Sequence, residues 1–481
     1  MADDANAKVP SHLPLDTHPD QYLHWKLSFE GPVAKLVMDV QQDRALGGAD
    51  YILKLNSYDL GVDIELADAV QRIRFEHPEV KVLMITSDQD RVFCSGANIY
   101  MLGSSTHSFK VNFCKYTNET RLGLEDLADS SGVATVAACN GTASGGGYEL
   151  ALACQKIALV DDGNSAVSFP EAPLLAVLPG TGGLTRLVDK RKVRRDRADV
   201  FSTVAEGIRG KRAVQWNLVD HVVPRSRWEE HMGKICGDLE KGARERKGAG
   251  ITLSPVGAQY TDDGLSYEYV TLSLDHGKKT GTLTVRGPNK PQPENAEGLH
   301  AAGDQAWVVK AFRELDDCLV RLRFEFPKVG YLSLRTEGDL DAVLQAERGL
   351  LNAKEDWLGN EVIHLIKRVM KRLDLTARSM FALVEPGSCF GGILLEMALL
   401  ADRVYMLDDP DGLVEVAISP LNGGAYPMAN GLSRLETRFL GEPERPAELL
   451  ARQGERMDTP EADAMGLVTD APDDLDWEDT V

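Results

Sequence analysis

Apolar positions in the first half of the chain follow two spacings, one typical of buried strands and one typical of helices. Residues 25–39 contain two β-rich runs separated by Gly31-Pro32, which predicts a hairpin. Residues 63–75 and 108–127 carry apolar side chains at helical spacing, and residues 80–87 form an apolar run that predicts a buried strand. Strands that alternate with helices predict an α/β sheet with right-handed crossovers.

The most informative stretch is Asn140–Leu152, where three consecutive glycines, Gly145 to Gly147, precede an apolar helix. Glycines leave backbone N–H groups uncovered at a helix N-terminus, where the helix dipole favours negative charge. The stretch lacks the Gly-x-Gly-x-x-Gly pattern of a dinucleotide site. On the glycines alone, a tight turn that needs glycine for its backbone angles is the simpler interpretation. The neighbouring motifs favour a donor site for an anion or an oxyanion.

The chain repeats its own pattern in its second half. Residues 72–83 reappear as 321–332, and the helix that contains Glu149 reappears around Glu396. Further matches keep the same order, among them Gly183-Leu-Thr-Arg-Leu and Gly431-Leu-Ser-Arg-Leu. Chance similarity between helices explains any one match but not the series, so we predict a duplicated fold.

This duplication predicts three parts of the chain: a polar arm over residues 1–21, a first domain over 22–250 and a second over 255–481. The Lys/Arg/Gly-rich run 241–250 is the expected linker. The second copy has no counterpart of residues 93–98. Its glycine turn, reduced to Gly391-Gly392, is expected to be shifted relative to Glu396. We therefore expect the second copy to have a structural role.

Composition narrows the classes of partner. The formal net charge of −21 over 481 residues argues against nucleic acid or an anionic membrane as the main partner. Seven scattered cysteines predict a reducing cytoplasm, and the polar, acidic N-terminus is not a signal peptide. The longest apolar helix, around residues 393–401, is too short to span a bilayer. We expect a soluble cytoplasmic protein that binds no metal.

Four stretches together resemble the crotonase, or enoyl-CoA hydratase/isomerase, superfamily: Ser95-Gly-Ala-Asn98, Gly145–Glu149, Phe169-Pro-Glu171 and Pro179–Arg186. The resemblance implies an α/β, crotonase-like (ββα) spiral fold, duplicated here, with a catalytic N-terminal copy and a degenerate C-terminal copy. It also implies an acyl-CoA thioester as the substrate and no separate cofactor, because coenzyme A is part of that substrate.

The same resemblance assigns roles to individual residues. The backbone N–H groups of Ala97 and Gly146 would form the oxyanion hole, and Glu149 and Glu171 would share acid and base work. The sequence leaves open which glutamate is the acid. Asn98 replaces the usual Asp, which weakens an expected capping or salt-bridge role there.

Further stretches resemble a branch of the superfamily that opens the ring of an epoxidised aryl-CoA with water. These stretches are residues 54–63, 93–99, 110–121 and 190–199. The branch makes Cys114 a candidate for ordering water or substrate, although a small buried side chain is the more general role of a cysteine. Two other functions stay open: hydration or isomerisation of an aliphatic enoyl-CoA, and non-catalytic binding of an acyl-CoA.

An acidic protein that binds coenzyme A needs local contacts for the phosphates and the adenine. The candidates for contact with substrate or coenzyme A are Arg44, Lys54, Asn56, Asn112 and Gly145. The basic run 190–197 is explained equally well as a solvated helix face. Superfamily members usually assemble from trimers, and we expect a homodimer here because the second copy would replace another subunit.

Overall fold

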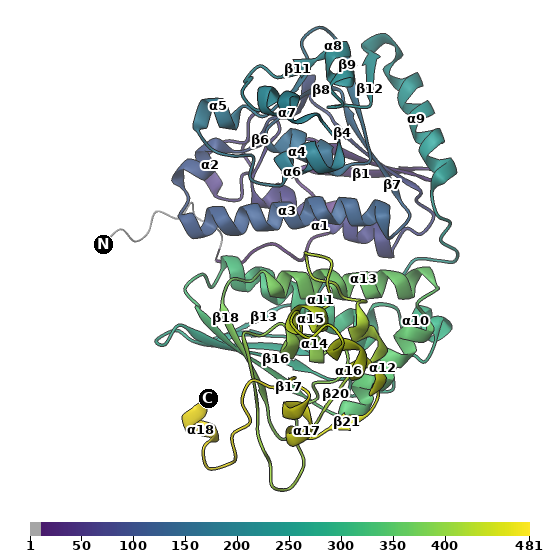
Figure 1. Cartoon of the computed structure of the whole chain (residues 1–481). Helices are drawn as coiled ribbons and strands as arrows, with labels where there is room; N and C mark the ends of the chain where they lie inside the picture. Colours follow the sequence, from purple (N-terminus) through teal and green to yellow (C-terminus); the bar gives the residue numbers. More distant parts are fainter. Residues whose placement is uncertain (1–10) are drawn as a thin grey trace. The chain divides into compact units, whose positions relative to one another are not determined.

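The computed structural model describes residues 11–481 and divides into two compact units, Met1–Gly250 and Ile251–Val481 (Figure 1). Residues 1–10 of the expected arm lie outside the described residues. Within the described part, Leu13 is buried and the chain forms a short 3-10 helix over Pro19–Gln21. No helix of residues 11–481 combines the length and the apolar composition that crossing a bilayer requires.

The first unit contains a six-stranded sheet in the order β1-β2-β4-β7-β9-β12. Its strands are β1 Trp25–Glu30, β2 Val33–Met38, β4 Val82–Ser87, β7 Ala134–Cys139, β9 Lys156–Asp161 and β12 His221–Pro224. The β1-β2 pair is antiparallel, and every other pair is parallel. The predicted hairpin is confirmed: Gly31, at its turn, has a φ of 59°.

The first unit also contains two smaller sheets. One has the order β11-β10-β8-β5, and the other pairs β3 with β6 in parallel. Their strands are β3 Ser57–Tyr58, β5 Arg91–Cys94, β6 Gly96–Ala97, β8 Gly141–Ser144, β10 Ala166–Ser168 and β11 Ile208–Arg209. Strand β8, between β7 and the glycines, was not expected from the sequence, because its four residues are too few to show a period.

Helices connect these strands. They are α1 Leu60–Phe75, α2 Ile99–Ser104, α3 His107–Asp129, α4 Gly146–Ala153, α5 Glu171–Leu175, α6 Gly183–Thr185, α7 Arg195–Phe201, α8 Gly210–Gln215 and α9 Trp228–Gly242. A single π-helical turn, Arg186–Lys190, continues α6. Helix α1 begins after Asp59, whose carboxylate accepts hydrogen bonds from the N–H groups of Gly61 and Val62. The predicted helices over 63–75 and 108–127 are confirmed as α1 and α3.

Helix α4 is buried along its whole length, and it packs against α3 and α6 (Figure 1). Helix α9 packs on strands β4, β7 and β12 of the sheet. Met232 and Cys236 of α9 join a buried apolar cluster with Val82, Val136 and Ala158 of the central strands. The glycine-rich N-terminus of α4 is thus held inside the unit by apolar packing.

The second unit contains a seven-stranded sheet in the order β13 to β19. Its strands are β13 Gln259–Thr261, β14 Gly264–Ser266, β15 Val270–Asp275, β16 Thr280–Arg286, β17 Tyr331–Glu337, β18 Ser379–Val384 and β19 Arg403–Met406. The pairs up to β16 are antiparallel, and β16 to β19 are parallel. A hairpin followed by parallel strands thus occurs in both units.

The remaining elements of the second unit are mostly helical. They are α10 Ala296–Ala302, α11 Trp307–Phe324, α12 Leu340–Asn352, α13 Trp357–Asp374, α14 Leu395–Leu399, α15 Arg434–Arg438, α16 Arg445–Ala451, α17 Thr459–Ala464, α18 Trp477–Thr480 and the strand pair β20 Val416–Ala417 with β21 Arg456–Met457. Helix α12 follows β17, where the first unit has β5, β6 and α2 after β4.

The run 241–250 is not a free linker. The buried Arg246 donates hydrogen bonds to the backbone carbonyls of Arg74 and His77, and Gly250 packs against Glu76. The sequence did not indicate these contacts, because charge and glycine content alone do not reveal that an arginine reaches into the protein.

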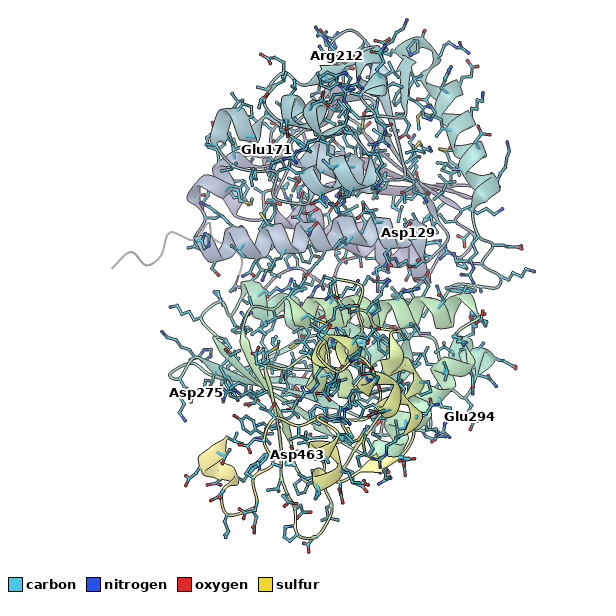
Figure 2. The ribbon with its side chains drawn as sticks, in the orientation of Figure 1. Asp129, Glu171, Arg212, Asp275, Glu294 and Asp463 are labelled. Carbon is cyan, nitrogen blue, oxygen red and sulfur yellow. The ribbon has the colours of Figure 1, made fainter. Side chains whose placement is uncertain are left out.

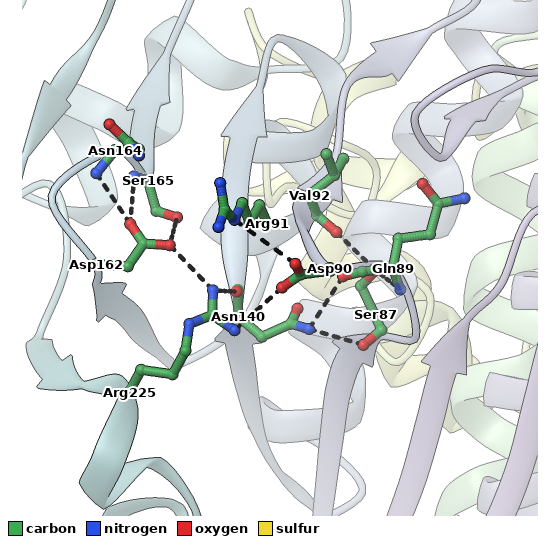
Figure 3. A network of polar contacts seen from close by, with 10 residues as sticks. All are labelled: Ser87, Gln89, Asp90, Arg91, Val92, Asn140, Asp162, Asn164, Ser165 and Arg225. Carbon is green, nitrogen blue, oxygen red and sulfur yellow. Dashed lines mark hydrogen bonds and ion pairs between the residues drawn. The ribbon is translucent and has the colours of Figure 1, made fainter.

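Polar contacts join the carboxyl ends of the parallel strands in the first unit (Figure 3). The Asp162 carboxylate, just after β9, accepts hydrogen bonds from the N–H groups of Asn164 and Ser165 and from Arg225, just after β12. Arg225 also contacts Asp90, and Asn140, just after β7, donates to the carbonyl of Ser87 at 2.9 Å. Burial raises the pKa of Asp162, but these hydrogen bonds outweigh it, so that the pKa lies well below its usual range.

We predict that Asp162→Asn lowers the free energy of unfolding by about 1–2 kcal/mol at pH 7, because it removes a charged acceptor from several donors. A lowered pKa in the folded state stabilises the fold above the unfolded pKa and loses that effect as pH falls. The difference between wild type and variant in urea unfolding should therefore shrink below about pH 4. A difference that stays constant from pH 7 to pH 3 would contradict this assignment.

Candidate active site

The glycine turn begins with Gly145, which has a φ of 53° and a ψ of −126° and precedes the first residue of α4. Its N–H donates to the carbonyl of Ser168 at 2.9 Å. A Cβ on Gly146 would lie 2.0 Å from the Tyr58 hydroxyl, and one on Gly147 would lie 2.2 Å from the carbonyl of Cys94. A side chain at Gly146 or Gly147 would therefore clash, and the φ of 53° at Gly145 is one that favours glycine.

The segment that carries Ala97 passes directly against this turn. A Cβ on Gly96 would lie 2.7 Å from the backbone nitrogen of Gly146. Tyr58 of β3 pairs with Ala97, and the Asn98 N–H donates to the Tyr58 carbonyl at 2.9 Å. The structure therefore brings Ala97 and Gly146, the two expected oxyanion donors, onto adjacent backbone segments.

Asn98 contributes more than the sequence indicated. Its Oδ1 caps α2 by accepting from the N–H groups of Tyr100 and Met101, so a capping role is present with Asn at this position. Its amide nitrogen also donates to the Ile52 carbonyl and the Ser57 hydroxyl. An ionised carboxylate could not make the bond to the Ile52 carbonyl, because it only accepts hydrogen bonds. Asn98 thus holds the start of α2 against the loop before β3.

Glu149 lies in the first turn of α4 and is 2% exposed. Its Oε1 accepts from the N–H groups of Thr181 and Gly183 at 3.0 and 2.8 Å, and its Oε2 accepts from the Thr181 hydroxyl at 2.5 Å. All three donors are uncharged. Within residues 11–481, the Glu149 carboxylate is thus held by hydrogen bonds from the loop 179–183 and by no ion pair.

Glu171 begins α5 and faces the same turn (Figure 2 labels it). A Cβ on Gly145 would lie 3.1 Å from Glu171 Oε2, an atom that is buried and accepts no hydrogen bond from residues 11–481. Burial, together with the negative charge of Glu149, raises the pKa of Glu171 to about 7, although its own backbone N–H acts in the opposite direction. The two glutamates thus lie at one turn in different environments.

Cys114 of α3 also faces this site. Its Sγ would lie 3.2 Å from a Cβ on Gly180, in the loop that holds Glu149. Burial raises the pKa of the Cys114 thiol, and the charge of Glu149 adds to the rise. The thiol is therefore held protonated, which opposes its use as a nucleophile. Asn112, also on α3, is half-buried.

The residues expected to bind coenzyme A divide into two groups. Arg44 and Lys54 are exposed on the loop between β2 and β3. Asn56, in contrast, is fully buried: its Oδ1 accepts from the Val40 N–H, and its Nδ2 donates to Ser87 Oγ and to two backbone carbonyls. We therefore assign the Asn56 side chain to holding the loop in place, not to contacting a ligand.

The basic run 190–197 is largely engaged within the protein. Lys190 contacts Glu125 and the Ala153 carbonyl, and Arg191 contacts Asp220. Arg194 pairs on the surface with Asp196. These contacts favour a structural role over the alternative of phosphate contact.

Sequence reasoning missed Thr181 as a partner of Glu149 and Tyr58 as a neighbour of Gly146. The signal for Thr181 was present in the stretch Pro179–Arg186, but nothing in that stretch indicates which acceptor its hydroxyl meets. Tyr58 had no signal, because its approach to Gly146 depends on the pairing of β3 with β6.

Comparison with known proteins places this arrangement in a family. A family model described as enoyl-CoA hydratase/isomerase matches residues 53–247, which include the glycine turn, both glutamates and the loop 179–183. The chain is 49% identical to the benzoyl-CoA-dihydrodiol lyase of Aromatoleum evansii over 478 residues, 99% of this chain and 86% of that protein. The chain therefore belongs to the enoyl-CoA hydratase/isomerase family, as the motifs predicted, and its likeness to that lyase extends over both units.

Other similar proteins match shorter parts of the chain. The fatty acid oxidation complex subunit alpha of Shewanella loihica is 33% identical over 163 residues, 34% of this chain and 22% of that protein. An enoyl-CoA hydratase from Geobacillus kaustophilus has a solved structure with a TM-score of 0.39 and 30% identity, covering 45% of this chain and 74% of that one. The roles of the individual site residues and the homodimer stay predictions.

The raised pKa of Glu171 predicts a pH dependence of stability. A carboxyl group with a pKa of about 7 in the folded state and 4.5 when exposed binds more protons when folded, so it destabilises the fold as pH rises between these values. Relative to Glu171→Gln, wild type should lose stability from about pH 4.5 to 7 and then stay level. Other titrating groups cancel in this difference of unfolding free energies, and a difference independent of pH would contradict the assignment.

Proposed function

We propose that residues 22–250 catalyse the hydrolytic ring opening of 2,3-epoxybenzoyl-CoA in aerobic, CoA-dependent benzoate degradation. Two waters are consumed, and the products are a dehydroadipyl-CoA semialdehyde and formate. The observation that carries the proposal is the 49% identity, over 99% of the chain, to a benzoyl-CoA-dihydrodiol lyase. Coenzyme A enters and leaves as part of the thioester.

In this proposal the thioester oxygen lies between the N–H groups of Ala97 and Gly146. The close approach of Gly96 to the Gly146 nitrogen supports this placement. Backbone donors of this kind stabilise a developing oxyanion, and losing one typically lowers kcat by about 10²–10³. Drawing charge onto the thioester oxygen activates the conjugated ring for attack by water.

The two glutamates then divide the proton transfers. We assign Glu149, which accepts three hydrogen bonds from uncharged groups, to the base that activates water. We assign Glu171, whose pKa is raised to about 7, to the acid that protonates the epoxide oxygen. Cys114, protonated and next to Gly180, would help to order the ring or the attacking water.

We predict that Glu149→Gln and Glu171→Gln each lower kcat for formate release from 2,3-epoxybenzoyl-CoA by about 10²–10⁴. Each substitution keeps the size of the side chain and removes its proton transfer. Formate measured by a coupled assay is the readout, and crotonyl-CoA serves as a second substrate. Hydration of crotonyl-CoA without formate from the epoxide would favour an enoyl-CoA hydratase. Binding of acyl-CoA without turnover of either would favour a non-catalytic binder.

We also propose that residues 255–481 are a degenerate, non-catalytic copy of the first unit. The backbone of its glycine turn supports this: Gly392 has a φ of 47° and donates to the Ala417 carbonyl, as Gly145 does to Ser168. Glu396 follows Gly392 at the spacing by which Glu149 follows Gly145. In this register the second glycine of Gly391-Gly392 corresponds to Gly145, the first of the three glycines, and Ile393 corresponds to Gly146.

Two acidic contacts in the second unit support the loss of activity. Glu347 of α12 accepts from the N–H of Ile393, which corresponds in register to Gly146, at 2.6 Å. Its other oxygen accepts from the Ser419 hydroxyl. The Glu347 carboxylate thus accepts the hydrogen bond of the amide that would face a substrate. In chain order, α12 follows β17 as the segment with Ala97 follows β4.

We predict that Glu347→Gln leaves kcat and KM for ring opening within about twofold of wild type. Glutamine keeps an acceptor for the Ile393 amide and the size of the side chain, so the fold is maintained. The measurement is the same formate assay, run beside Glu149→Gln. A loss of activity from Glu347→Gln comparable to that from Glu149→Gln, at unchanged stability, would contradict the non-catalytic role.

A further inference from the structure

Arg186 lies directly behind the loop that holds Glu149. It is buried, and its Nε and Nη2 atoms donate to the two carboxylate oxygens of Glu125 on α3, each at 2.9 Å. Its Nη1 donates to the Thr181 carbonyl at 2.6 Å. A guanidinium bound by two bonds to a carboxylate is fixed in orientation, so its third contact is directed at one point.

The third contact of Arg186 holds one side of the loop 179–183 at the Thr181 carbonyl. The other side of this loop binds Glu149. The carbonyl of Thr181 faces Arg186, and the Thr181 N–H and hydroxyl face the Glu149 carboxylate. Gly182, with a φ of 84°, turns the chain so that the Gly183 N–H reaches the same carboxylate. The arginine thus reaches Glu149 only through the loop.

The corresponding arginine of the second unit makes a different contact. Arg434 also binds a carboxylate with two nitrogens, that of Asp374 on α13, and also donates to a backbone carbonyl, that of Tyr426. Its Nη1, however, donates directly to Glu396 at 2.7 Å. In the second unit Arg434 therefore pairs directly with Glu396. In the first unit the loop with Thr181 separates Arg186 from Glu149.

We propose that Arg186 is a positioning residue for Glu149. By holding the Thr181 carbonyl, it directs the Thr181 amide and hydroxyl at the carboxylate and keeps its own charge off that carboxylate. Glu149 is thereby oriented by neutral donors and remains available to accept a proton. This inference rests on the proposed catalytic role of Glu149.

The test compares two buried arginines that make the same kinds of contact. Arg191 donates to the Asn217 carbonyl and to Asp220, away from Glu149, so Arg191→Gln is the matched control for Arg186→Gln. We expect Arg186→Gln to lower kcat for formate release about 10- to 100-fold with KM changed less than threefold. Arg191→Gln should lower the melting temperature similarly and leave both constants near wild type.

A second pair of variants tests the loop itself and stays informative if Arg186→Gln does not fold. Thr181→Val removes the hydroxyl and should lower kcat about tenfold or more, and Thr181→Ser should restore it. Equal effects of Arg186→Gln and Arg191→Gln on kcat, or an effect on KM alone, would overturn the proposal, as would full activity of Thr181→Val. Full activity of Glu149→Gln would instead reject the proposed function on which this inference rests.

Discussion

The first turn of α4 has no room for a Cβ on Gly146 or Gly147. A Cβ on Gly146 would overlap Tyr58, and one on Gly147 would overlap the Cys94 carbonyl. Gly96 approaches the same turn from β6. These close contacts fix the position of the segment with Ala97 against the start of α4. The buried α4 anchors both to the sheet.

Around this turn, two buried carboxylates have different partners. Glu149 receives three hydrogen bonds from uncharged donors of the loop 179–183. Glu171 has a buried oxygen with no donor among residues 11–481, and its pKa rises to about 7. In the second unit Arg434 pairs directly with Glu396, the counterpart of Glu149. The two units thus share a similar glycine turn, but the glutamate on it meets uncharged donors in the first unit and an arginine in the second.

Much of the fold was readable from the sequence, since hydrophobic periodicity marks α1, α3 and the central strands directly. The glycines and the two glutamates were also readable, as motifs. The partners of Asn56, Asn98 and Arg246 were not readable, because they lie far away in the chain. A polar residue in a loop shows its type in the sequence but not its partner, and the partner decides whether it faces ligand or protein.

The sequence by itself determined the family, the α/β class and the local chemistry of the glycine turn, because these depend on residue types at short, regular spacings. Tertiary structure decided which donors reach Glu149, that Asn56 is withdrawn into the protein, and that Arg186 and Arg434 meet different partners. Those outcomes depend on distances of a few ångströms between segments far apart in the chain. Hydrogen bonds and burial energies are sensitive to such distances, and residue spacing does not encode them.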